Sequence, residues 1–151
     1  MPKDETKEER LDRELEELLQ ELRIALPGVQ ILFAFLLVVP FNNRFSQTDE
    51  LERDIWFVAL LFALGAVACF ITPTAYHRIR FRDFDKERLV LTATRLALVG
   101  LVCLAVSLAA SAFFVTGFVF SDVAAGVVAA IAVGAIGGLW FALPLTRKLR
   151  E

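Results

Sequence analysis

The sequence predicts an all-α, polytopic membrane protein, with four transmembrane helices in an antiparallel bundle preceded by a cytoplasmic amphipathic helix. Of its 151 residues, 57% are hydrophobic, and the mean hydropathy of +0.61 is well above that of a soluble domain of this length. Charged residues cluster at the two ends and in two short inner stretches, as expected where lipid excludes charge from the segments between them. Each of the four intervening apolar segments is long enough to cross a hydrocarbon core of about 30 Å.

The first predicted element is an acidic amphipathic helix over residues 1–23. Leucines recur along one face of it, at alternating spacings of four and three residues: Leu11, Leu15, Leu18 and Leu22. Five Lys or Arg against nine Asp or Glu give this segment a net charge of −4, which argues against tight docking on anionic lipid. We expect the leucines to rest on the membrane surface or on the protein's own inner loop. Self-association through this cytoplasmic interaction face and binding of a partner protein are the alternatives.

The first span is predicted at residues 24–41, directly after the charged segment. Pro27 lacks an N–H and clashes with the carbonyl group four residues earlier. We therefore expect a joint at Pro27 and Gly28, either as a kink in one continuous helix or as the start of a new helix. Gln30 is the most polar side chain well inside any span. We expect it to form a hydrogen bond between helices, with a place in a polar path as the alternative.

A polar loop precedes the second span, which is predicted at residues 55–75. Thr48 or Asp49 is a suitable cap for a helix leading into the membrane, and Trp56 lies at the depth of an aromatic belt. The loop after this span is rich in basic residues: Arg78, Arg80, Arg82, Lys86 and Arg88. Because they lie beside a membrane span, we expect them to contact lipid headgroups and not nucleic acid.

The last two spans are predicted at residues 96–120 and 123–145, followed by a basic tail at residues 146–151. A tight turn at Ser121 and Asp122 makes the two spans antiparallel neighbours. Small residues recur at every fourth position of the last span: Gly126, Ala130, Gly134 and Gly138. Such a face permits close helix packing, either within one protomer or between protomers.

The distribution of basic residues predicts the orientation. Residues 1–23, the loop at residues 76–95 and the tail carry five, six and three Lys or Arg, whereas the loop at residues 42–54 carries two and the turn at Ser121 and Asp122 carries none. The positive-inside rule then places both termini in the cytoplasm.

Catalytic and metal-binding chemistry is not expected. No Asp, Glu, Lys, Arg or His lies in the middle of a predicted span, and no nucleophile with its base, phosphate-binding loop or metal cluster is recognisable. Cys69 and Cys103 lie in apolar segments without zinc-site spacing, so we interpret them as small membrane-embedded side chains and expect no disulfide. The sequence therefore predicts neither an enzyme nor a cofactor.

Two segments carry a resemblance to a known family: ELRIALPGVQILFAFLL at the start of the first span, and ITPTAYHRIRFR at the end of the second. The chain resembles a family of small four-span bacterial membrane proteins of unknown function, which implies location in the bacterial cytoplasmic membrane. Some members are labelled sodium:proton antiporters, yet no carboxylate suited to that exchange lies at the predicted midplane.

Two functions are therefore considered. The first is an oligomeric organising or interaction protein of the cytoplasmic membrane. The alternative is a small channel or carrier with a path between protomers, lined by Gln30, Ser107, Ser111 and the small residues of the last span.

Overall fold

The computed structural model describes residues 6–79 and 86–142, apart from the side chains of residues 77–79, 86 and 141. It contains four long helices in chain order: α1 (Lys7–Val38), α2 (Glu50–Ile79), α3 (Lys86–Val119) and α4 (Asp122–Ile136). Two 3₁₀ turns, η1 (Val39–Phe41) and η2 (Asn43–Gln47), connect α1 to α2, and a π-helical segment, η3 (Gly137–Ala142), continues α4.

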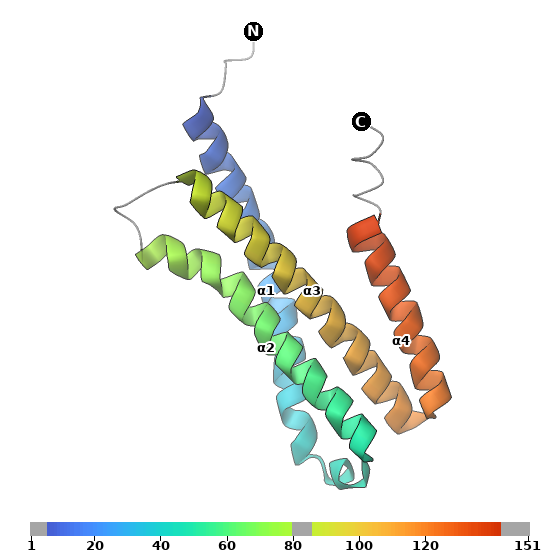
Figure 1. The fold of residues 1–151 in the computed structure, drawn as a ribbon. Helices are drawn as coiled ribbons and strands as arrows, with labels where there is room; N and C mark the ends of the chain where they lie inside the picture. The colour runs from blue at the N-terminus through green and yellow to red at the C-terminus, as the bar shows by residue number, and fades with distance from the viewer. Residues whose placement is uncertain (1–5, 80–85, 143–151) are drawn as a thin grey trace.

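The four helices run alternately in opposite directions (Figure 1). At one end of the bundle, here called the amino-terminal end, α1 and α3 begin and α2 and α4 end. The distal end holds the connection at residues 39–49 and the turn at residues 120–121. The first three helices pack together, whereas α4 packs on α3 and not appreciably on α1 or α2. The predicted all-α class is confirmed, and four helices long and apolar enough to cross a membrane indicate a multi-pass membrane protein.

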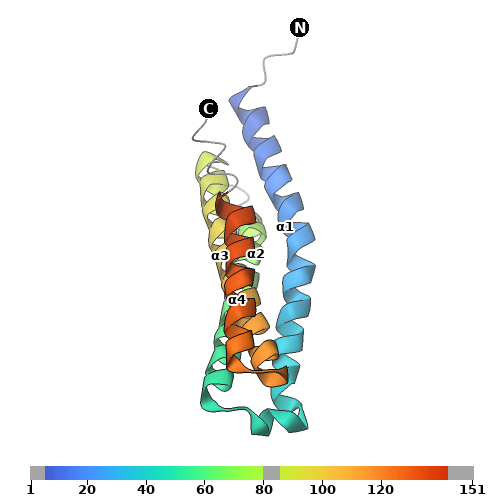
Figure 2. The same ribbon diagram turned by 90° about the vertical axis from the view of Figure 1, so that its right-hand side faces the viewer.

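The predicted amphipathic helix is not a separate element. Residues 7–23 are the first part of α1, which continues for 32 residues with Pro27 inside it. At about 1.5 Å per residue it is about 48 Å long, well beyond the thickness of a hydrocarbon core. Figure 2 shows a bend near the middle of α1, as expected where a proline interrupts the hydrogen-bond ladder. The expected joint is therefore a bend within one continuous helix.

A single apolar seam explains why α1 continues past its proline. Leu22, Val29 and Leu36 are buried at intervals of seven residues. Half-buried side chains complete the seam between and before them: Leu11, Leu15, Leu18, Ala25, Leu26, Leu32 and Phe33. A seven-residue repeat keeps one face of a helix against its neighbours over many turns. The leucine face predicted for residues 1–23 is thus the first half of the seam that packs α1 on the other helices.

The contact between α2 and α3 is the most extensive between two described helices, and small residues line it. Ala59, Ala63, Ala66 and Ala93 have no exposed surface. A Cβ atom built on Gly100 would lie 2.4 Å from Cε1 of Phe70, which is itself only 2% exposed. Gly100 therefore allows the aromatic ring of α2 to lie directly against the backbone of α3.

Reciprocal side-chain caps define the starts of α1 and α2. At the first, the Glu9 backbone N–H donates to Thr6 Oγ1 over 3.3 Å, and the Thr6 N–H donates to a Glu9 carboxylate oxygen over 2.9 Å. At the second, the Glu52 N–H donates to Asp49 Oδ1 over 2.7 Å, and the Asp49 N–H donates back to the Glu52 carboxylate over 3.3 Å. Of the two predicted caps for α2, Asp49 is the one used, in a capping box.

The predicted span limits differ from the observed helices mainly at the amino-terminal end. Spans predicted at 55–75 and 96–120 correspond to α2 and α3, and α3 begins ten residues before its predicted span. The last span is helical as far as Ala142. Residues 143–145 and the basic tail at 146–151 lie outside the described residues.

Candidate interaction surfaces

The leucine face predicted to be an interaction surface is turned toward the rest of the chain. Leu22 is 8% exposed and forms a buried cluster with Val29, Ala66 and Phe70, on which Leu18 also packs. Leu11 and Leu15 are half-buried, and Leu11 lines a small cavity together with Val90. The charged side chains of the same segment point outward. The outward face of this part of α1 is therefore its charged face, and its leucines lie against the rest of the chain.

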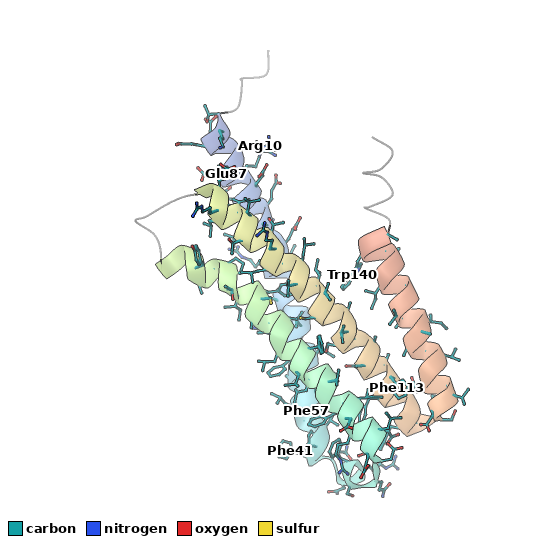
Figure 3. The ribbon with its side chains drawn as sticks, viewed as in Figure 1. Arg10, Phe41, Phe57, Glu87, Phe113 and Trp140 are labelled. Carbon is teal, nitrogen blue, oxygen red and sulfur yellow. The ribbon has the colours of Figure 1, made fainter. Side chains whose placement is uncertain are left out.

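The first turns of α1 and α3 are joined at the amino-terminal end. Lys7 Nζ lies 2.6 Å from a Glu87 carboxylate oxygen, and both side chains are more than half exposed. Figure 3 shows Arg10 and Glu87 side by side at this end, contributed by α1 and α3. Arg10 itself pairs with Glu14 of the next turn over 2.8 Å. Exposed ion pairs contribute less than about 1 kcal/mol each to stability. The Lys7–Glu87 pair therefore serves mainly as a marker that the starts of α1 and α3 lie side by side.

The small residues predicted to pack α4 lie on its uncovered side. Cβ atoms built on Gly126, Gly134 or Gly138 would meet no atom within 4 Å, and Ala130 is exposed. The face that does pack on α3 is centred on Ala125, which has no exposed surface. Gly117 of α3 lies opposite, where an added Cβ would be 3.6 Å from that of Ala125. The regularly spaced small residues thus pack against none of the helices that the structure describes.

Pro27, Gly28 and Gln30 lie on the outward side of α1. All three are exposed, and a Cβ built on Gly28 would meet nothing within 4 Å. Ile24 and Ile31 share this exposure, at 76% and 59%. The Gln30 carboxamide makes no hydrogen bond with any residue that the structure describes, so it does not join α1 to another helix of the same chain.

Two side chains join helices through acceptors that the sequence did not identify. Ser107 of α3 donates a hydrogen bond to the carbonyl oxygen of Ala59 on α2. Trp56 of α2 donates through Nε1 to the carbonyl oxygen of Leu36 on α1, over 3.0 Å. Ser107 and Trp56 were recognisable as a span serine and an interfacial aromatic residue. Nothing in the sequence identified their acceptors, because both acceptors are backbone carbonyl groups.

The distal end carries an aromatic cluster around Trp56. The Phe45 ring meets the Trp56 ring edge-on, with centroids 5.1 Å apart, and the Arg53 guanidinium lies 6.0 Å from the Phe45 centroid. Thr48 is 6% exposed and donates to the Phe45 carbonyl oxygen over 2.7 Å. A cavity of about 150 Å³ opens beside this cluster. These contacts hold the short connection between α1 and α2 in a defined conformation.

The predicted headgroup residues are described only in part. Arg80 and Arg82 lie outside the described residues, and the side chains of Arg78 and Lys86 are likewise not described. Arg88 is exposed in the first turn of α3. Their role in headgroup contact stays a prediction.

The residues proposed to line a polar path do not share one surface of this chain. Ser107 is fully buried, and its hydroxyl is already bonded. The Ser111 hydroxyl is buried and has no partner among the described residues. Gln30 lies on the outward side of α1, and the small face of α4 lies beyond α3. In addition, the part of the chain that the structure describes contains no group of three His, Cys, Asp or Glu able to hold a metal.

Residues 4–144 match a family of unknown function, DUF6328. The chain belongs to the DUF6328 family. The match covers both segments that carried the resemblance and extends through α3 and α4, where only hydropathy was informative. No curated protein matches this DUF6328 chain, and no solved structure does.

Proposed function

We propose that this DUF6328 protein is a homo-oligomeric organising protein of the bacterial cytoplasmic membrane, with both termini in the cytoplasm. The carrying observation is the position of α4. Among the described residues it packs mainly on α3, and its other side presents Gly126, Ala130, Gly134 and Gly138, which are exposed. Inside a bilayer, close approach of such small-residue faces is a main source of helix association.

The charge distribution supports the orientation, and the lengths of α1 and α3 support a role at the cytoplasmic face. Fourteen of the sixteen Lys and Arg lie in the segments that this orientation places inside. If the hydrocarbon begins near Ile24, about 25 Å of α1 projects from the membrane at about 1.5 Å per residue, with the start of α3 alongside. Each oligomer would thus present a rigid, charged pair of helix ends, repeated once per protomer.

The test replaces Gly134 by Cys in a variant in which Cys69 and Cys103 are both Ala, and oxidises native membranes. Two α4 helices that meet through this face are expected to form a disulfide-linked dimer. Gly117→Cys in the same background is the matched control, because that position packs on Ala125 within the chain. Dimer at position 134 and little at position 117 supports the proposal. Equal, low yields at both positions would show that this face of α4 meets lipid only.

A second variant, Gly134→Leu, adds four carbons where two backbones are proposed to meet. We expect it to reduce the oligomer recovered in mild detergent to protomers while the protomer keeps its thermal stability, because a Cβ at this position meets no described atom within 4 Å. An oligomer of unchanged mass with this substitution would refute the proposed interface.

A further inference from the structure

A crevice lies between α1 and α2 near the amino-terminal end, with a volume of about 340 Å³. Its apolar wall includes Leu22 and Phe70, both nearly buried, and Ile71, which is 42% exposed at the edge. Arg23 and Thr74 complete the lining, and both are exposed. The crevice is therefore apolar inside, and its polar groups are at the rim.

The shape follows from where the two helices part. Figure 1 shows α2 leaving α1 toward the amino-terminal end, beyond the closely packed middle of the bundle. Each helix carries a proline near this region, Pro27 in α1 and Pro73 in α2. Prolines inside helices favour bends, which let two packed helices diverge without losing their contacts further along.

The depth of the crevice coincides with one boundary of the apolar segments. Arg23 is the last charged residue before the first span, and Thr74 lies in the last turns of the apolar part of α2. If the apolar segments span the bilayer, the Arg23 guanidinium lies near the level of the lipid phosphate groups, and Leu26 lies one turn deeper, at the level of the acyl chains. The rim and the wall of the crevice thus match the two halves of an amphiphile.

Neither polar group at the rim bonds to a residue that the structure describes. Arg23 forms no ion pair with any residue described. Thr74 donates no hydrogen bond to a described residue, whereas Thr72, two residues earlier, bonds back to the Ala68 carbonyl oxygen over 2.7 Å. Arginine presents several donors in a plane that suits phosphate oxygens.

We propose that this crevice binds one anionic phospholipid, with its phosphate on Arg23 and Thr74 and an acyl chain along Leu26, Phe70 and Ile71. An extended peptide fits less well, because helices leave no backbone N–H or C=O groups to pair with it. A small soluble anion would leave the apolar wall uncovered. The site does not depend on the proposed oligomer, because both of its walls belong to one chain.

The first experiment is native mass spectrometry of the purified full-length protein with dioleoyl-phosphatidylglycerol or dioleoyl-phosphatidylcholine. We expect about tenfold tighter binding of the anionic lipid, and loss of that preference in Arg23→Gln. Arg95→Gln is the control, since it removes one exposed positive charge from the same end of the bundle but outside the crevice. A preference that survives Arg23→Gln, or that falls equally in Arg95→Gln, would overturn the proposed site.

The second experiment tests the apolar part. Ile71→Trp fills the edge of the crevice and leaves Arg23 intact, so binding of the dioleoyl lipid should fall several-fold while binding of dihexanoyl-phosphatidylglycerol changes little. Leu64→Trp is the control, an exposed residue two turns away on the same helix and outside the crevice. Equal effects of the two substitutions would refute an acyl-chain site. The same spectra report copy number, so failure of the oligomer and failure of the lipid site are distinguishable.

Discussion

The Ser107 hydroxyl of α3 donates a hydrogen bond to the Ala59 carbonyl oxygen of α2 over 2.8 Å, in a contact where neither residue has exposed surface. A serine in a membrane helix can instead bond back to its own backbone. Here the small alanine surface of α2 lets α3 approach closely enough for the bond to cross between helices. The bond therefore shows which turn of α3 lies beside which turn of α2.

Ser107→Ala should lower the free energy of unfolding by about 0.6 kcal/mol, the usual size of such bonds inside membrane proteins. The measurement is thermal or denaturant unfolding in mild detergent. Ser111→Ala is the matched control one turn away, because its hydroxyl is buried without a partner among the described residues. The control should be neutral or slightly stabilising, and a larger loss at Ser111 than at Ser107 would contradict the assigned bond.

Gly100→Ala should loosen the contact between α2 and α3. Its new methyl group would lie 2.4 Å from a ring that is already 2% exposed and has little room to move. Overpacking of this kind costs about 1–3 kcal/mol. Gly65→Ala, in the same contact, would place its methyl group at an ordinary 3.5 Å from Cys103 Sγ and should be tolerated. Equal stability of the two variants in an unfolding series would contradict the observed packing.

Gln30→Leu should leave the stability of the isolated protomer unchanged or raise it. The carboxamide bonds to no described residue, and an apolar side chain costs less against lipid or detergent tails. Unfolding at a dilution where only protomers are present gives the comparison. A destabilisation as large as that of Ser107→Ala would show that Gln30 does have a partner within its own chain.

A short bifunctional thiol reagent should link Cys residues placed at positions 7 and 87, in a variant where Cys69 and Cys103 are Ala. Lys7 and Glu87 form an ion pair of 2.6 Å, so the distance between their backbones is spanned by these two side chains and is within reach of a short linker. Cys at positions 17 and 87 is the control, since ten residues further along α1 is about 15 Å away. An independent amino-terminal helix would instead give similar, low yields for both pairs.

The helix count, the order of the helices and their alternating direction were predictable because a bilayer admits few alternatives. Backbone groups must be satisfied within each apolar segment, so every such segment of this length is a helix. The continuity of α1 was harder, since Pro27 and the change from charged to apolar sequence both resemble a boundary. Continuity is indicated by Leu22, Val29 and Leu36, which are spaced seven residues apart on both sides of Pro27 and therefore share one face of a single helix.

The surfaces were less predictable than the helices. On α4, small residues occupy neighbouring faces, so Ala125 and Gly126 are equally suited to packing on α3 by size alone. On α1, Gln30 follows directly after the buried Val29. Whether its carboxamide points inward depends on which face of the helix carries the buried residues. The Asp49 cap was recognisable from Glu52 three residues later. The crevice at Arg23 was not, because it depends on how two bent helices diverge.

The packing of α4 on α3 has a consequence for assembly in the membrane. The contacts among the first three helices do not involve the last helix, so they can form before it joins them. The last helix then adds through a turn of two residues and a contact with its immediate predecessor in the chain. Insertion of this protein can thus proceed in two steps, and truncation after residue 120 should still yield a folded, membrane-inserted product.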